Sequence, residues 1–291
     1  CVMNVIRKNI NFAKVITKNY SSMSGLPLKS VIEKLNVFAP ENYAESWDNV
    51  GLLIEPHTKR NIDKILLTND LTENVMNEAV KLQVSLIISY HPPIFAPLKR
   101  ITQSSWKERI VSLCLEQKIA LFSPHTSWDS VRNGVTDWLA KCLPHTDSKP
   151  VIPRSDDPEI GAGRLCQVSG TLTLKQAIEK IKNHTKLTNI QVGIAANGSL
   201  DSEIKTFAVC AGSGGSVLKG VSADLYLTGE MSHHEVLDAN HRNSHVILLN
   251  HSNSERGFLT EFKQILDSQL LKGAGIEVCI SQCDEDPLKI A

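Results

Sequence analysis

The stretch Val84-Ser-Leu-Ile-Ile-Ser89 decides the fold class, because it is a short and continuous apolar run. Strands of a parallel sheet that helices cover on both faces have this character. A predicted strand over residues 62–70 and a predicted helix over residues 71–81, with Thr72 as its N-cap, precede the run. This order of strand, helix and strand is the unit that builds α/β folds.

The same alternation continues along most of the chain. Spacing of apolar residues predicts further helices over residues 28–38, 106–117, 134–143, 174–185, 217–221, 235–242 and 256–271. Further strands are predicted over residues 119–123, 165–173, 190–195, 204–211, 224–228, 245–250 and 276–281. We therefore expect an α/β fold with mostly parallel sheets, in which ligands bind beyond the carboxyl ends of the strands.

Two segments of the chain have their parts in the same order. Residues 62–91 and 204–234 each run from a strand through a turn and a helix to a second strand and a polar segment with histidine. A helix, a third strand and an H-x-x-x-[DE] element then follow in both. This order predicts a duplication, with halves over about residues 25–143 and 159–291 and a Pro-rich bridge over residues 144–158. A pseudo-twofold relation between the halves would bring both sets of strand ends to one cleft.

The two H-x-x-x-[DE] elements carry the residue types that bind divalent metals. One is His251-Ser-Asn-Ser-Glu255 and the other is His125-Thr-Ser-Trp-Asp129, and each follows a strand of buried character. Imidazoles and carboxylates that converge from several strands can hold one or two ions with open positions for water or substrate. We predict His91, Asp129, His251 and Glu255 as metal ligands, and His125 as a fifth ligand or as a group that orients Asp129.

Each of these residues also has an ordinary structural interpretation. A histidine at a strand end is commonly a hydrogen-bonded surface group, and an acid at a helix start is commonly a cap or a dipole partner. Four such residues at equivalent places in a duplicated chain favour a functional site.

Two glycine-containing stretches are candidates for substrate binding. Gly212-Ser-Gly-Gly215 follows a strand and can cradle a phosphate with its backbone N–H groups. Gly161-Ala-Gly-Arg164 pairs glycines with a cation that can hold an anion. The candidates are Gly212, Ser213, Gly214 and Arg164, and the alternative for both stretches is a tight turn.

Composition limits the classes of partner. The chain has 31 basic and 31 acidic residues, so its formal net charge of zero gives no general attraction to nucleic acid, and we expect no direct nucleic-acid partner. No apolar run approaches the roughly 18 residues of a transmembrane helix, so no membrane partner is expected. Seven scattered cysteines without a C-x-x-C pair favour a reducing compartment, and we expect a cytoplasmic location.

The first 24 residues differ from the rest of the chain. They contain Arg7, Lys8, Lys14 and Lys18, and no acid occurs before Glu33. Such a basic leader resembles a mitochondrial transit peptide, and a disordered leader is the alternative. A mitochondrial location is therefore a second hypothesis.

Seven motifs together resemble the Nif-three-like family, over about residues 25–291. They are Ser46-Trp-Asp-Asn-Val-Gly-Leu52, Ser89-Tyr-His-Pro-Pro-Ile-Phe95, Ser123-Pro-His-Thr-Ser-Trp-Asp129, Gly161-Ala-Gly-Arg164, Cys210-Ala-Gly-Ser-Gly-Gly215, Leu227-Thr-Gly-Glu-Met-Ser-His-His234 and Asn250-His-Ser-Asn-Ser-Glu-Arg-Gly257. The resemblance implies two duplicated, intertwined three-layer α/β/α halves and a toroidal homohexamer with a two-metal site facing its interior. Bacterial members are labelled GTP cyclohydrolase I type 2 homologues, and the eukaryotic branch is named for interaction with a transcriptional adaptor.

The resemblance also implies a role for each candidate ligand. His91 and Asp129 match ligands of one ion, His251 matches a ligand of the other, and Glu255 matches the bridging carboxylate. Tyr90 stands where bacterial members have histidine, and a phenol with a pKa near 10 is a poor ligand at neutral pH. We therefore expect one divalent ion (zinc, manganese or iron) on His91, Asp129 and Glu255, with a second ion weak or absent. The inserted regulatory-like domain of many members is absent here.

Two functions follow from these observations. The first is a metal-dependent hydrolase of a small or nucleotide-like substrate, with His125 or His234 as the general acid or base. The second is a non-enzymatic homo-oligomeric scaffold that interacts with transcription regulators and keeps the metal as a structural element. Tyr90 favours the scaffold, and the retained H-x-x-x-[DE] pairs favour the hydrolase.

Overall fold

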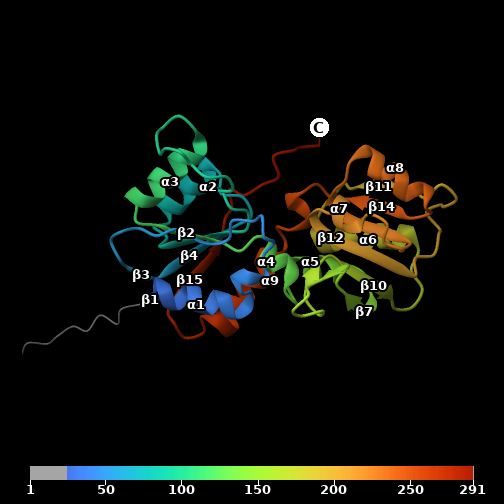
Figure 1. Cartoon of the computed structure of the whole chain (residues 1–291), viewed down its shortest axis with the longest axis horizontal. Coiled ribbons are helices and arrows are strands. Elements are labelled where there is room, and N and C mark those ends of the chain that lie inside the picture. Colours follow the sequence, from blue (N-terminus) through green and yellow to red (C-terminus); the bar gives the residue numbers. More distant parts are fainter. Residues whose placement is uncertain (1–24, 291) are drawn as a thin grey trace, which may run out of the picture.

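The computed structural model describes residues 25–290, so the basic leader predicted over residues 1–24 lies outside the described residues. Two β-sheets lie side by side, each with helices on its faces, and α4, α5 and α9 lie between them (Figure 1). No helix in this part of the chain has the length and apolar character that crossing a membrane requires.

The first sheet contains the stretch that predicted the fold class. Its strands stand in the order β15-β4-β5-β6-β2, and all neighbours are parallel except β2, which is antiparallel to β6. The strands are β2 (Gly51–Ile54), β4 (Lys64–Thr68), β5 (Leu86–Ser89), β6 (Ala120–Ser123) and β15 (Glu277–Ile280). The helices nearest to it are α1 (Leu28–Phe38), α2 (Glu73–Lys81) and α3 (Trp106–Glu116).

Burial explains why β5 is apolar throughout. Leu86 and Ile88 belong to the large core cluster that includes α1, whereas Ile87 between them belongs to the cluster of α2 and α3. Both faces of the strand are therefore covered, as its composition predicts. The start of α2 is also as predicted, because the Thr72 side chain accepts a hydrogen bond from the Val75 N–H.

The second sheet has parallel central strands and antiparallel outer strands. Its order is β11-β14-β13-β12-β10-β7, and β12, β13 and β14 are parallel. The strands are β7 (His145–Lys149), β10 (Arg164–Val168), β11 (Gln191–Gly193), β12 (Thr206–Ser213), β13 (Leu225–Glu230) and β14 (His245–Leu248). The helices of this half are α6 (Leu174–Thr185), α7 (Gly215–Leu218) and α8 (His233–His241).

The remaining elements are short or connect the halves. The helices are α4 (Thr126–Ser130), α5 (Val135–Ala140), α9 (Phe258–Ile265), the 3₁₀ helices η1 (Glu41–Tyr43) and η2 (Ser252–Ser254) and the π-helix η3 (Leu266–Leu270). Two small antiparallel pairs are β1 (Leu26–Pro27) with β3 (Asn61–Ile62) and β8 (Ile152–Pro153) with β9 (Gly161–Ala162).

The two sheets repeat one arrangement, in agreement with the predicted duplication. Each has three adjacent parallel strands in chain order, β4-β5-β6 and β12-β13-β14, and an H-x-x-x-[DE] element follows the third strand of each. The halves exchange an element, because the last strand β15 returns to pair with β4 of the first sheet.

The predicted bridge over residues 144–158 is more than a connection. It contains β7, which pairs with β10 at the edge of the second sheet, and β8. The sequence of β7, His-Thr-Asp-Ser-Lys, has no apolar run because this edge strand is largely exposed. Edge strands need little apolar character, and the sequence pattern therefore missed it.

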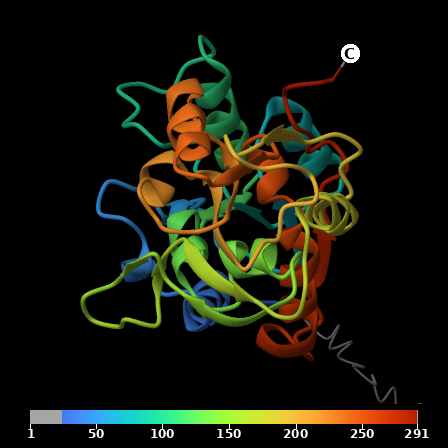
Figure 2. The ribbon, with the colours of Figure 1, turned by 90° about the vertical axis from the view of Figure 1, so that its right-hand side faces the viewer.

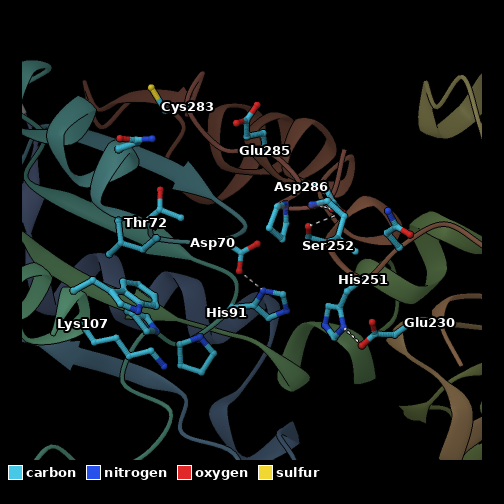
Figure 3. A pocket seen from close by; sticks show the side chains of 18 residues that line it. Asp70, Thr72, His91, Lys107, Glu230, His251, Ser252, Cys283, Glu285 and Asp286 are labelled. Carbon is cyan, nitrogen blue, oxygen red and sulfur yellow. Dashed lines mark hydrogen bonds and ion pairs between the residues drawn. The ribbon is translucent and has the colours of Figure 1, made fainter. Parts of the chain in front are cut away.

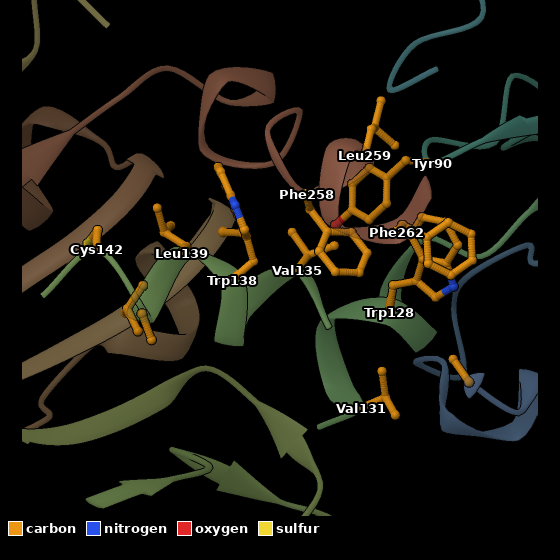
Figure 4. Packing of buried hydrophobic residues seen from close by; sticks show 14 of the residues in the cluster. Tyr90, Trp128, Val131, Val135, Trp138, Leu139, Cys142, Phe258, Leu259 and Phe262 are labelled. Atoms are coloured by element: carbon orange, nitrogen blue, oxygen red, sulfur yellow. The ribbon is translucent and has the colours of Figure 1, made fainter. Parts of the chain in front are cut away.

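An aromatic core joins the two halves beneath the strand ends (Figure 4). The Trp128 ring of α4 lies 4.0 Å from the Phe262 ring of α9, centroid to centroid, and the Phe38 ring of α1 lies 5.3 Å from Phe262. The blue α1, the green α4 and α5 and the red α9 stay close together in the side view (Figure 2). Because α4 contains Asp129 and α9 follows Glu255, this core fixes the two H-x-x-x-[DE] elements relative to each other.

Candidate metal centre

His91 lies just beyond β5, with one ring nitrogen hydrogen-bonded and the other facing Glu255 without a hydrogen bond. Its Nδ1 is 2.8 Å from Asp70 Oδ1, at the end of the neighbouring strand β4 (Figure 3). Its Nε2 is buried, has no hydrogen bond, and lies 3.4 Å from Glu255 Oε2. A buried imidazole nitrogen without a partner is costly unless a ligand satisfies it.

Glu255 lies between two imidazoles from different halves. Its side chain is only 2% exposed, and Oε1 is 3.4 Å from His251 Nε2 while Oε2 faces His91. The Asn69 side chain donates a hydrogen bond to Oε2 at 3.0 Å. His251 Nδ1 lies 2.8 Å from Glu230 Oε1, so this ring is also held from behind (Figure 3).

The ring of His125 is also held at Nδ1 by a carboxylate, as the rings of His91 and His251 are. Its Nδ1 is 2.7 Å from Oδ1 of Asp48, whose side chain is fully buried, and its ring centroid lies 5.3 Å from that of His91. The backbone of His125 has φ 37° and ψ −120°, a conformation that L residues rarely adopt and that costs about 1–3 kcal/mol. Such strain persists only where the surroundings hold it, here through Asp48 and the start of α4.

The residues that face one another fit a divalent metal ion. His91, His251 and Glu255 each offer a ligand atom, and these atoms lie within 4.8 Å of one another. Two imidazoles and a carboxylate suit zinc, manganese or iron, and a carboxylate behind each imidazole is typical of metal-ligating histidines. The Nε2 of His91, which has no hydrogen bond, would bind such an ion through its lone pair.

The electrostatics of the site favour a positive charge at this place. Burial lowers the pKa of His91, but the charge of Glu255 and the hydrogen bond to Asp70 outweigh it and raise the pKa to about 10. A cation at the unpaired nitrogen would meet the same attraction.

Asp129 is held differently from Glu255. Oδ1 of Asp129 accepts a hydrogen bond of 2.6 Å from the phenol of Tyr90, which is itself buried. Burial raises the pKa of Asp129 to about 6 and raises the pKa of Tyr90 well above its usual value, so the phenol keeps its proton and donates. The described group therefore combines His251, and not Asp129, with His91 and Glu255. Metal ligation by Asp129 stays a prediction.

Comparison with known proteins identifies the family. The family model described as Duf34/NIF3 (NGG1p interacting factor 3) matches residues 26–287. The chain belongs to this family. Among its relatives, NIF3-like protein 1 of Drosophila melanogaster is 49% identical over 272 residues, which cover 93% of this chain and 91% of that protein. The NGG1-interacting factor 3 of Saccharomyces cerevisiae is 37% identical over 283 residues, which cover 91% of this chain and 97% of that protein.

Solved structures show the NIF3 fold of this chain. Reduced HcgD from Methanocaldococcus jannaschii has a TM-score of 0.75 at 27% identity and covers 88% of this chain and 98% of that one. The hypothetical protein SA1388 from Staphylococcus aureus has a TM-score of 0.79 at 24% identity and covers 92% of this chain and 100% of that one. The resemblance to the Nif-three-like family and the predicted α/β fold are thus confirmed.

The structure corrects the prediction that Arg164 of this NIF3 chain binds an anionic substrate. The Arg164 side chain is 2% exposed, and its Nε donates to Asp137 Oδ1 at 2.6 Å. Its remaining N–H groups donate to backbone carbonyls of Gly161, Gly163, Ser130 and Val131. No donor remains for a ligand, so Arg164 ties β10 to the end of α4 and to α5.

In the glycine stretch at the end of β12, two of the N–H groups predicted to cradle a phosphate are already occupied. The Gly212 N–H donates to Ser254 Oγ at 2.7 Å, and the Gly214 N–H donates to Thr228 Oγ1 at 3.0 Å, while Ser213 is exposed. Gly212 has a different importance, since φ is +65° and a Cβ there would lie 2.5 Å from Glu255 Oε1. The chain passes directly against the candidate ligands, and only glycine fits this position.

His234 also lies apart from the group. It is exposed in the first turn of α8 and lines a separate small cavity with Lys219 and Glu235. The cavity beside the candidate ligands, about 620 Å³, is lined by His91, His251 and other residues from both halves. His125 is therefore the better placed of the two predicted acid or base residues.

Sequence reasoning missed the carboxylates behind the imidazoles. Asp70 and Glu230 each stand at or just beyond the carboxyl end of a strand, and the paired histidine lies two or three residues beyond the end of the parallel neighbour of that strand. Asp48 precedes β2, which pairs with the strand before His125. An acid and a histidine at the ends of adjacent strands are the sequence pattern that predicts all three carboxylates.

Proposed function

We propose that this NIF3-family protein is a divalent-metal-dependent hydrolase of a small or nucleotide-like substrate. The observation that carries the proposal is the buried, unpaired Nε2 of His91, which faces Glu255 near His251 Nε2. An ion on these residues would polarise the scissile group and lower the pKa of a bound water.

The residues of the chain have separate tasks in this proposal. Asp70 and Glu230 hold Nδ1 of their histidines, so that both Nε2 atoms face inward. The amide of Asn69 donates to Glu255 and keeps that carboxylate between the two rings.

His125 is the proposed general acid or base, because its ring lies next to His91 while its Nδ1 is fixed by Asp48. Moving a proton at Nε2 needs a ring with one tautomer and one orientation, and a buried carboxylate supplies both. The neighbouring cavity of about 620 Å³ has room for a small substrate.

The test combines metal content with a hydrolase screen. Wild-type protein and His251→Ala are measured after loading with zinc, manganese or iron, with His241→Ala as a control on the exposed face of α8. We expect metal-dependent turnover in the wild type and the control, and loss of both metal and turnover in His251→Ala. Wild-type protein that takes up no metal and hydrolyses nothing when metal is added would sink the proposal.

A scaffold that interacts with transcription regulators is the second candidate. It is favoured by the name of the yeast relative, NGG1-interacting factor 3, at 37% identity. In this case regulator binding would survive both removal of the metal by a chelator and His251→Ala.

We also propose that the chain forms a homohexamer, which light scattering tests by its molecular mass.

A further inference from the structure

Two large aromatic side chains are exposed beside the candidate metal centre. Trp47 is 60% exposed and Phe95 is 48% exposed, and their ring centroids are 6.0 Å apart with planes tilted by 60°. Both lie near His125, with centroids at 6.1 Å for Trp47 and 6.4 Å for Phe95. Exposed aromatic rings that gather at one place commonly mark a binding site.

The backbone under these rings is fixed, although the rings themselves are exposed. Asp48, next to Trp47, accepts hydrogen bonds from the Thr126 N–H at 3.1 Å and from the Thr126 hydroxyl. The Glu45 N–H donates to the same hydroxyl oxygen at 3.0 Å. The Asn49 side chain donates to the Ile94 carbonyl, which joins the Trp47 loop to the Phe95 loop. The backbone that carries the two rings is therefore fixed before any ligand arrives.

The aromatic pair stands at one end of a row of rings. The row continues from His125 to His91 at 5.3 Å and from His91 to His251 at 5.1 Å, centroid to centroid. A molecule that contacts Trp47 and Phe95 is then one imidazole away from the candidate ligand His91.

We propose that Trp47 and Phe95 bind the planar heteroaromatic ring of a small ligand, such as a nucleobase. Two exposed rings with planes tilted by 60° give a flat group an aromatic surface on which to pack, and every nucleobase has a face on which to stack. This inference rests on the proposed function only for the reaction that follows binding. Ring binding itself is measurable without turnover.

The experiment measures binding of AMP and GMP to the metal-loaded full chain by calorimetry, with ribose 5-phosphate as the probe that lacks the ring. Trp47→Ala and Phe95→Ala should each weaken nucleotide binding about ten- to a hundredfold, since stacking on one aromatic side chain has this effect. Trp47→Phe should retain most of the affinity. Leu237→Ala, an exposed apolar side chain on α8, is the matched control and should change nothing. Ribose 5-phosphate should bind more weakly than AMP and should not respond to Trp47→Ala.

Several results would overturn the assignment. They are equal nucleotide affinity of Trp47→Ala and wild type, equal binding of AMP and ribose 5-phosphate, or no nucleotide binding by the wild type. A change of molecular mass in Trp47→Ala with unchanged nucleotide affinity would assign the rings to contact between copies of the chain. Nucleotide binding that depends on Trp47 without any hydrolysis would support the ring site and count against the hydrolase. Hydrolysis of a substrate without a ring, unaffected by Trp47→Ala, would support the hydrolase and count against the ring site.

Discussion

The elements His125-x-x-x-Asp129 and His251-x-x-x-Glu255 follow equivalent strands of the two sheets, but their acidic residues make different contacts. Glu255 lies between the imidazoles of His91 and His251, and Asn69 donates to it. Asp129 instead accepts the phenol hydrogen bond of Tyr90. One element thus offers two ligand atoms, whereas the acid of the other is held by a neighbouring side chain.

Local backbone and side-chain length account for much of this difference. His251 has φ −53° and leads into the 3₁₀ helix η2, whereas His125 has φ 37° and leads into α4. Glu255 has one methylene more than Asp129, and its two oxygens face two different rings. A duplicated pattern therefore preserves the position of a pair of residues but does not preserve their contacts.

The largest expected effect of a substitution in these elements is that of Glu255→Gln. The amide keeps the shape of the side chain but removes the charge between His91 and His251. We expect metal affinity, measured against a competing chelator, to fall by more than about a hundredfold, because even partners outside the ligand set change affinity about ten- to a hundredfold. Glu277→Gln, an exposed glutamate on β15, is the control. Unchanged metal affinity in Glu255→Gln would contradict the assignment of this ligand.

Tyr90→Phe tests how the other element is held. Removal of the phenol leaves Asp129 without that donor, and we expect the free energy of unfolding to fall by about 1–3 kcal/mol in urea titrations. Tyr226→Phe is the matched control, since this buried phenol donates to the neutral carbonyl of Val221 and should cost less. Equal costs for the two substitutions would show that the Asp129 charge adds nothing to the bond.

Asp129→Asn decides whether the two acids share one function. Because the described ligand group contains Glu255 and not Asp129, we expect the metal affinity to fall by about tenfold or less, the lower end of the effect of an outer partner. A loss as large as that of Glu255→Gln would make Asp129 a ligand, as the family resemblance implies, and the two elements would then be chemically alike.

The sequence predicted strands well where one local segment carries the signal. The apolar run of β5 and the histidine after it needed no distant information, and both occur where predicted. The partner carboxylates lie 21 residues from His91 and 77 residues from His125, so only the sheet order brings them together. The prediction that Arg164 binds an anion fails for the same reason: its partner Asp137 lies 27 residues earlier, and burial removes the charge of Arg164 from solvent.

The smallest expected loss of metal affinity is that of a substitution in one of the two carboxylates that hydrogen-bond to the candidate ligand histidines. Glu230 is 55% exposed beside His251, whereas Asp70 is 35% exposed beside the more buried His91. Water and salt screen exposed charges, so we expect Glu230→Gln to lower the metal affinity only a few-fold and Asp70→Asn to lower it about ten- to a hundredfold. Raising the ionic strength should reduce the effect of Glu230→Gln and leave that of Asp70→Asn nearly unchanged. Equal losses for both variants at all salt concentrations would mean that another contact, such as burial of Glu230 against a second copy of the chain, shields this carboxylate from solvent.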